Sequence, residues 1–219
     1  MQSLPMRRAG RKAQSGFTLV EIAIVLVIIG LLLGGVLKGQ ELIENAKIKN
    51  LRNDYQGVSA AFYGYKDRYN TVPGDDTRAT TRGWTGATDG NGNGVIGGVN
   101  NFQACAAGTG NERCYFWRHL RHAGLITGTT NNASPTNAYG GAIAVTQSAG
   151  ATTGAPAGLL ICMGNIPGKA AAGIDSGFDD GIPNTGSVRG VEGANNATPF
   201  VGAATGYDET QTYTVCKTL

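Results

Sequence analysis

Two hydrophobic patterns follow one another in the first third of the chain. Residues 17–37 form a nearly continuous apolar run that carries one charge, Glu21. A helix of about 20 apolar residues is long enough to cross a bilayer. After Lys38 the apolar positions recur at spacings of three and four, at Ile48, Leu51, Tyr55, Val58, Phe62 and Tyr65. This spacing predicts an amphipathic stripe, so we expect one helix from about Thr18 to about Arg68.

The rest of the chain alternates short apolar runs with turn residues. Pro73 and Gly74 end the long helix, and apolar residues at helical spacing predict a second helix over 112–128. A connection rich in tight turns occupies 173–190. Short runs bounded by turn residues predict strands at 141–147, 158–163 and 211–217. A small antiparallel sheet packed across the long helix makes this an α+β fold with glycine-rich loops.

Glycine is unevenly distributed along the chain. Only eight of the 35 glycines in the 219 residues precede residue 74. Because a glycine inside a helix costs about 1 kcal/mol relative to alanine, the first third suits a long helix and the remainder suits turns. The glycines keep no every-third spacing and there are only seven prolines, which excludes a collagen-like chain.

Basic residues are concentrated before the apolar run. Residues 1–16 contain Arg7, Arg8, Arg11 and Lys12 and no acid. Without this segment the formal charge falls from +3 to about −1, so bulk charge gives no support to nucleic acid as a partner. A basic flank keeps the amino terminus in the cytoplasm. The alternative is a signal peptide or signal anchor, but the run is long for a signal-peptide core and no small-residue cleavage site follows it.

The single carboxylate of the apolar run needs a partner. Glu21 lies near the start of this helix, where a charge costs about 2–3 kcal/mol on insertion scales. Cleavage between Gly16 and Phe17 would place a free α-amino group about one helical turn from this carboxylate. A basic leader, the sequence Gly-Phe-Thr-Leu-Val-Glu at 16–21 and an apolar helix to Leu37 are present together. This combination resembles the class III signal of type IV pilins and type II secretion pseudopilins.

The resemblance implies how the chain is processed and organised. A prepilin peptidase cuts after Gly16 and methylates Phe17, and Glu21 pairs with the amino terminus of a neighbouring subunit. The chain then divides into a cleaved leader, a transmembrane and filament-core helix, the amphipathic continuation of that helix, and a globular loop-rich α+β domain. These parts correspond to residues 1–16, 17–38, 39–70 and 71–219.

The same resemblance implies a structural subunit of a type IV pilus-like filament. The precursor spans the bacterial inner membrane once, with its amino terminus in the cytoplasm. An assembly platform with an ATPase then moves it into a homo-oligomeric helical filament in the periplasm or outside the cell. The alternatives are a type II secretion pseudopilin and a minor tip pilin that acts in adhesion or DNA uptake.

One feature departs from the family pattern. Many pilins carry a proline about two-thirds of the way along the apolar stretch, where the helix unwinds in the filament. Lys38 stands at that place in this chain. Gly30, Gly34 and Gly35 are the candidate positions for local unwinding, since glycine weakens a helix.

The segment 89–96 matches the first half of a calcium loop. The ligand positions of such a loop fall on Asp89, Asn91, Asn93 and Val95. Gly94 permits the turn, but Asn100 replaces the bidentate glutamate of the twelfth position. Carboxylates that could complete the site are Asp75, Asp76, Asp179 and Asp180. Two interpretations stay open, a calcium site, which pilin-like proteins are known to hold in these loops, and an Asn/Gly turn without an ion.

Four cysteines indicate an oxidising compartment and disulfide bonds. Three connectivities are possible. We favour Cys105–Cys114, which are close in sequence, and Cys162–Cys216, which both fall in predicted strands. A zinc site is disfavoured because no CxxC pair occurs.

Catalytic signatures are missing from the sequence. No nucleophile–base–acid set, Walker loop or dinucleotide fingerprint occurs, so an enzyme is not expected. His119 and His122 are three residues apart and could share a metal, but no third ligand is apparent and a structural role is expected instead. Core packing is also expected for the aromatic residues Tyr55, Phe62, Tyr63, Tyr65 and Tyr69.

Overall fold

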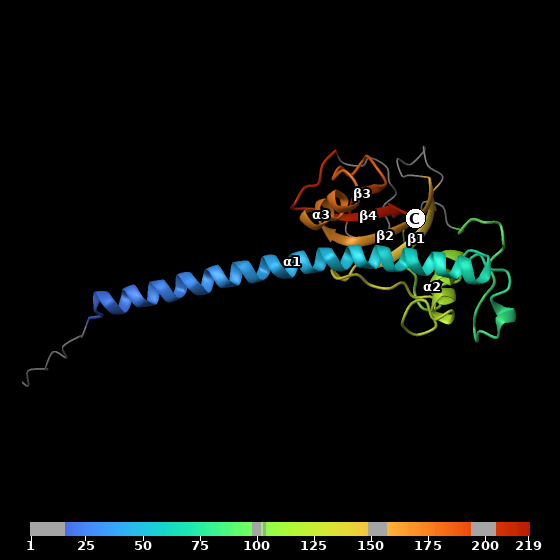
Figure 1. Cartoon of the computed structure of the whole chain (residues 1–219), viewed down its shortest axis with the longest axis horizontal. Coiled ribbons are helices and arrows are strands. Elements are labelled where there is room, and N and C mark those ends of the chain that lie inside the picture. Colours follow the sequence, from blue (N-terminus) through green and yellow to red (C-terminus); the bar gives the residue numbers. More distant parts are fainter. Residues whose placement is uncertain (1–15, 98–101, 103, 149–156, 194–204) are drawn as a thin grey trace, which may run out of the picture. The chain divides into compact units, whose positions relative to one another are not determined.

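The computed structural model describes residues 16–97, 102, 104–148, 157–193 and 205–219. Its elements, in chain order, are α1 (Leu19–Tyr69), a short 3-10 helix η1 (Thr80–Arg82), α2 (Glu112–His122), β1 (Ile143–Ser148), β2 (Gly158–Pro167), α3 (Gly168–Phe178), β3 (Val188–Glu192) and β4 (Thr212–Thr218) (Figure 1). The chain divides into two compact units, which we call the amino-terminal unit (Met1–Ile43) and the head unit (Glu44–Leu219).

The head unit contains one antiparallel sheet of four strands in the order β1-β2-β4-β3. The long strand β2 pairs with β1 on one side and with β4 on the other, and its register with β4 shifts between Met163 and Ile166. β3 completes the sheet beyond β4. Together with α1, α2 and α3, this sheet confirms the predicted α+β fold.

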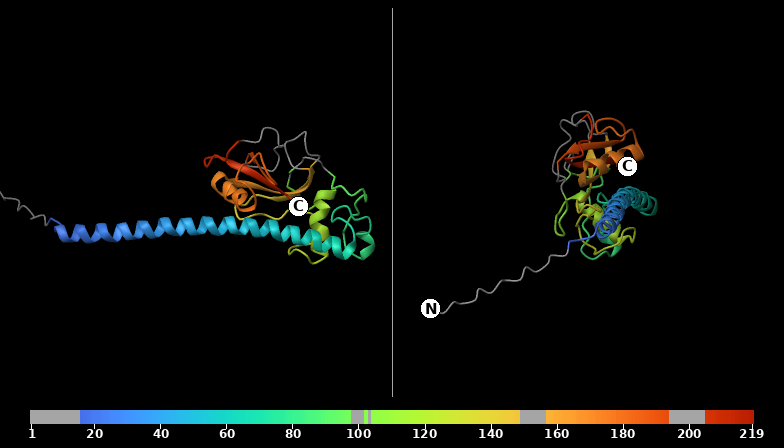
Figure 2. Two further views of the ribbon diagram at one scale, coloured as in Figure 1. Left: turned by 45° about the horizontal axis from the view of Figure 1, so that its top comes forward. Right: turned by 90° about the vertical axis from the view of Figure 1, so that its left-hand side faces the viewer.

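The predicted stripe of α1 is buried in the head unit. Leu51, Tyr55, Val58, Phe62 and Tyr65 are all buried, and Ile48 is half-buried at the edge of the same cluster. Figure 2 shows this part of α1 running beside the sheet and α2. The hydroxyl of Tyr55 donates a hydrogen bond to the carbonyl of Val215 in β4 at 2.5 Å. The stripe therefore attaches α1 to the sheet by apolar packing and by one buried polar contact.

Alternate residues of the strands face opposite sides of the sheet, as the pleat requires. Ile161 and Met163 of β2 belong to the core cluster that contains the α1 stripe. Leu160 and Cys162 of the same strand instead join Phe102 in a second, smaller cluster. The sheet is therefore buried on both faces.

Two elements of the head unit differ from the sequence prediction. The segment 173–190 was expected to be a connection of turns, but α3 covers its first part and β3 covers its end. The tight turn before β3 is present, with Gly186 at a positive φ of 67°. Tyr63 was expected in the core, but it is 54% exposed because it lies off the buried stripe.

The second helix is shorter than the predicted range of 112–128. It ends at His122, and Gly124 follows with a φ of 68°. The amide of Leu125 donates to the carbonyl of Leu120, and that of Gly124 donates to Arg121. These two bonds form a Schellman motif, in which a left-handed glycine satisfies the last carbonyls of the helix.

Candidate functional site

The start of α1 is closed by a reciprocal pair of hydrogen bonds between Thr18 and Glu21. The carboxylate oxygen Oε2 of Glu21 accepts from the amide of Thr18 at 2.8 Å and from its hydroxyl at 2.9 Å. In return, the hydroxyl of Thr18 accepts from the amide of Glu21 at 3.2 Å. This is a capping box, which satisfies amides that the first turn of a helix leaves unpaired. The Thr-x-x-Glu spacing was present in the sequence, but it was not used in our prediction.

Both bonds from Thr18 converge on a single oxygen of Glu21. Across the part of the chain that the structure describes, no hydrogen bond to the other oxygen, Oε1, is found. Gly16 and Phe17 precede the helix, and the side chain of Phe17 is 85% exposed. Cleavage after Gly16 would therefore place the new amino terminus, on Phe17, one residue before Thr18 of the capping box and four residues before Glu21.

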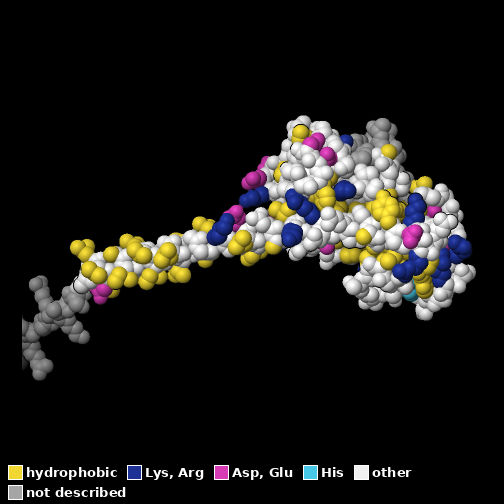
Figure 3. Space-filling model, in the orientation of Figure 1, with side chains coloured by type: hydrophobic (Ala, Val, Ile, Leu, Met, Phe, Trp, Pro, Cys, Tyr) yellow, Lys and Arg dark blue, Asp and Glu magenta, His cyan; other side chains and the backbone are white. Residues whose placement is uncertain are grey.

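The apolar side chains of the amino-terminal unit are exposed all along the helix. Their exposed fraction ranges from 46% at Ile29 to 90% at Leu19. Figure 3 shows these side chains covering the visible face of this part of α1. Among the described residues, α1 is the one helix that is long and apolar enough to cross a membrane. Such a surface is unfavourable in water, so it requires lipid or other apolar surfaces around it.

The comparison with protein families identifies this segment. Residues 11–37 match the family model of the prokaryotic N-terminal methylation motif. The chain carries the class III signal of type IV pilins and pseudopilins. The match covers the residues just before the apolar run and the run itself, and it does not extend into the head unit. Comparisons with curated proteins and with solved structures gave no match.

The methylation motif accounts for the composition of the amino-terminal unit. The signal and the exposed apolar helix fit a precursor that is anchored in a membrane before it enters a filament. Gly16 and Phe17 precede the start of α1, and Glu21 lies in its first turn. α1 is helical through Gly30, Gly34 and Gly35, so unwinding in a filament stays a prediction.

The loop that matches a calcium motif is held by its own side chains. Both oxygens of Asp89 accept hydrogen bonds from Thr80, one from the amide and one from the hydroxyl, each at 2.8 Å. The side-chain oxygen of Asn91 accepts from the amide of Asn93, and that of Asn93 accepts from the amide of Val95. These two contacts are Asx turns, which fold such a loop locally.

Two buried carboxylates lie beneath this loop. Asp75 accepts from the amides of Gly92 at 2.6 Å and Gly94 at 2.7 Å. Glu112, at the start of α2, accepts from the amides of Asn91 at 3.0 Å and Gly97 at 2.7 Å. The structure thus brings Asp75, one of the four carboxylates considered as extra ligands, to the loop. It adds Glu112, which our prediction missed because it is distant in sequence.

The other predicted calcium ligands lie elsewhere. Asp76 accepts from the hydroxyl of Tyr65 at 2.7 Å and pairs with Arg82 at 2.8 Å. Burial alone would raise the pKa of Asp76, but these contacts and the amide of Arg78 outweigh burial and lower it. Asp76 is therefore engaged in a buried contact between α1 and the segment after it.

Asp179 and Asp180 group with Asp175 at the end of α3. Their ligand atoms lie within 4.8 Å of one another, and Asp175 is buried. Burial raises the pKa of Asp175, hydrogen bonds from Tyr207 and the amide of Gly181 offset part of this rise, and the nearby charges of Asp180 and Asp179 add to it. The twelfth loop position, Asn100, lies outside the described residues.

Calcium binding in the loop stays a prediction. A calcium titration of the full chain, followed by its melting temperature, tests it. An ion bound to the folded loop raises the melting temperature, whereas an unchanged value at millimolar calcium excludes the site.

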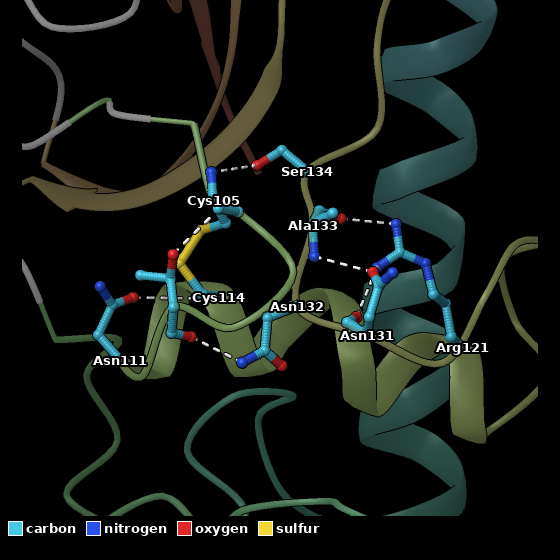
Figure 4. Close-up of a disulfide and its surroundings, with 10 residues drawn as sticks. Cys105, Asn111, Cys114, Arg121, Asn131, Asn132, Ala133 and Ser134 are labelled. Atoms are coloured by element: carbon cyan, nitrogen blue, oxygen red, sulfur yellow. Dashed lines mark hydrogen bonds between the residues drawn. A yellow bond between two sulfur atoms is a disulfide. The ribbon is translucent and has the colours of Figure 1, made fainter.

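Two disulfides join the four cysteines in the favoured pairs. Cys105–Cys114 connects a loop to the first turn of α2, and Cys162–Cys216 joins opposite residues of β2 and β4. Figure 4 shows the first bridge beside Asn111, whose side chain accepts from the amide of Cys114 at 3.1 Å and caps α2. The amide of Cys105 donates to the hydroxyl of Ser134 at 3.0 Å.

The two histidines of the second helix have structural contacts. His119 is buried, and its Nδ1 accepts from the amide of Gly74 at 2.9 Å. Its Nε2 lies 2.8 Å from the carbonyl of Thr88, which requires Nε2 to carry the proton. His122 stacks on Trp84 with 5.4 Å between ring centroids. Because both ring nitrogens of His119 bond to the backbone, this residue has no lone pair free for a metal.

Proposed function

We propose that this protein is a structural subunit of a type IV pilus-like filament. The observation that carries the proposal is the methylation motif at residues 11–37, joined to a helix whose apolar side chains are exposed. In this proposal a prepilin peptidase removes residues 1–16 and methylates the amino group of Phe17. The exposed apolar helix is held by the membrane first and by the helices of other subunits afterwards.

Glu21 directs the proposed assembly. Its Oε2 is held by Thr18, and its Oε1 is left for a cation from outside the subunit. The amino terminus of a neighbouring subunit supplies that cation. A carboxylate in an apolar environment gains far more from a cation than it would in water, because little solvent screens the pair. The pairing therefore selects one register among many apolar packings of similar energy.

The head unit has the properties expected of the outer part of such a filament. Its core and both disulfides are contained within Glu44–Leu219. The bridges suit an oxidising compartment beyond the inner membrane. The partners in this proposal are other copies of the chain, the peptidase and the assembly machine with its ATPase.

Substitutions at Gly16 and Glu21 test the processing and assembly steps separately. The methyl group added by Gly16→Ala meets open space, so this substitution should not disturb the fold. We expect it to block cleavage and to leave an uncut precursor. Glu21→Ala is expected to be cut and methylated but to yield few filaments. Normal trimming of the Gly16 variant would contradict the class III interpretation.

The location of the filaments distinguishes a pilin from a pseudopilin. Filaments at the cell surface indicate a pilin, whereas filaments confined to the periplasm, with a secretion defect on deletion, indicate a pseudopilin.

A further inference from the structure

A pocket of about 270 Å³ lies beside α1 in the head unit. Its walls come from α1, α2 and the segment between α2 and β1, and they are mainly apolar, with Val58, Trp117, Ile126 and Ile143 among them. The volume equals about nine water molecules at liquid density, which is enough for one long side chain. Asp54 of α1 also lines this pocket.

Two polar groups on the walls have no partner within the described part of the chain. Asp54 is half-buried, and none of the described residues forms a hydrogen bond or ion pair with its carboxylate. The indole Nε1 of Trp117 is buried without an acceptor there. Burial raises the pKa of Asp54, which reflects the cost of an unpaired charge at this place. Buried polar groups without a partner are uncommon in native proteins, so the indole of Trp117 requires an explanation, whereas the carboxylate of Asp54 is only partly removed from water.

Other carboxylates differ from Asp54 in exposure. The described carboxylates that also lack a hydrogen bond or ion pair are Asp67, Glu192 and Glu209, and all three are exposed. Water satisfies such groups at little cost. Asp54 is therefore the one described carboxylate that combines partial burial with the lack of a partner.

The complementary group is also present on this chain. The lysines Lys49, Lys66 and Lys169 are exposed, and the described residues offer their ammonium groups no partner. A lysine stem packs along apolar walls while its ammonium reaches a carboxylate. The lysines of α1 cannot reach Asp54 in the same chain. Lys49 is five residues away, a spacing at which helix side chains do not meet, and Lys66 is about 18 Å along the helix.

We propose that this pocket receives a lysine side chain from a second copy of the chain, with the ammonium placed on the carboxylate of Asp54. The inference rests on the proposed filament function. In a helical filament such a contact is heterologous, and each copy gives one lysine and receives another. Contacts of that kind generate open helical polymers when the rotation does not close.

Zero-length cross-linking of purified filaments tests the contact directly. A carbodiimide joins a carboxylate to an amine only where the two touch. We expect a cross-linked dimer of the full chain whose linked peptides contain Asp54 and one of the three lysines. Asp54→Asn should remove that linked peptide, and the matched control Asp67→Asn should keep it. Filaments without any linked peptide at Asp54 would overturn the proposal.

Charge reversal gives a second readout. Asp54→Lys should lower filament yield at least tenfold with normal processing, whereas Asp67→Lys should leave the yield within about twofold. Adding Lys49→Asp, Lys66→Asp or Lys169→Asp in turn should restore assembly for the lysine that pairs. A defect that none of the three restores would overturn the proposal, as would an Asp54→Lys yield equal to that of the unchanged chain.

Melting temperature and filament yield, measured on the same variant, distinguish a folding defect from an assembly defect. Asp54→Asn removes an unpaired charge, so it should keep or raise the melting temperature of the detergent-solubilised full chain while it lowers filament yield. If Asp54→Asn lowered both the melting temperature and the filament yield, Asp54 would have a role within the subunit, and the proposal would be overturned. If the unchanged chain forms filaments and the Asp54 variants do too, the pocket inference fails alone. If the unchanged chain is processed but forms no filament, the proposed function fails with it.

Discussion

The amide of Thr18 donates a hydrogen bond to Oε2 of Glu21 at 2.8 Å, so the one carboxylate within the matched motif also caps its own helix. In the proposed assembly, this contact would orient Glu21 before a neighbouring subunit arrives. Preorganisation of this kind lowers the entropy lost when the second contact forms. The capping residue Thr18 is therefore expected to matter for assembly as well as for helix stability.

Thr18→Ala should lower filament yield several-fold, because loss of an N-cap hydroxyl costs about 1 kcal/mol and leaves Glu21 less well oriented. Cleavage after Gly16 should continue. Thr18→Ser retains the hydroxyl and should behave as the unchanged chain does. Equal yields for the alanine and serine variants, measured on sheared filaments, would show that the capping box has no part in assembly.

The contact between α1 and the sheet can be tested at Tyr55. Tyr55→Phe removes the bond to the carbonyl of Val215 without changing the apolar packing, so it should lower the free energy of unfolding by roughly 1 kcal/mol. Tyr63→Phe is the matched control, since Tyr63 is 54% exposed and should show no change. Urea unfolding of a soluble fragment that covers the head unit measures both.

Burial of His119 predicts that the head unit loses stability in mild acid. Desolvation lowers the pKa of His119 in the folded state, and hydrogen bonding to Thr88 offsets only part of this. As pH falls below about 6.5, the unfolded chain binds a proton that the folded chain does not bind. The free energy of unfolding should therefore fall with pH, by up to about 1.4 kcal/mol per pH unit from this residue.

His119→Gln can keep an acceptor and a donor near both backbone partners but cannot titrate. Its stability should depend less on pH between 5 and 7 than that of the unchanged chain, when both are measured by urea unfolding. The pH dependence of stability that remains in the His119→Gln variant includes a contribution from His122, whose pKa is also lowered, chiefly by burial. Parallel pH profiles for the two proteins would rule out His119 as the source.

The two disulfides should differ in their contribution to stability. The bridge Cys162–Cys216 spans 54 residues and Cys105–Cys114 spans nine. In the loop-entropy model, their removal costs about 4 and about 3 kcal/mol respectively. Replacement of each pair by alanine, followed by thermal unfolding, should give the larger loss for the long bridge. The opposite order would show that contacts in the folded state outweigh the entropy of the unfolded chain.

The long helix was predictable because its signals are local and strong. The apolar run and the stripe from Ile48 to Tyr65 each repeat over several turns, and the helix found, Leu19–Tyr69, differs from the prediction by one residue at each end. The methylation motif was predictable for the same reason. Its residues are contiguous, so no tertiary contact is needed to recognise them.

α3 and β3 were missed because tertiary contacts override their local sequence. α3 contains three glycines, and a side chain at Gly168 would collide with the backbone at Asp208. In β3, a side chain at Gly190 would collide with the ring of Tyr207. These glycines permit close packing, but in the sequence they indicate turns. The same limit applies to Glu112 beneath the 89–97 loop and to the pocket around Asp54, since both depend on segments that are far apart along the chain.

In the proposed function, the subunit is cut after Gly16, methylated on Phe17 and assembled into a filament. The most direct test is the intact mass of the principal protein in purified filaments. We expect the mass of residues 17–219 with one added methyl group on the amino terminus and two disulfides. Filaments that lack this chain, or a chain that keeps its leader or begins at another residue, would contradict it.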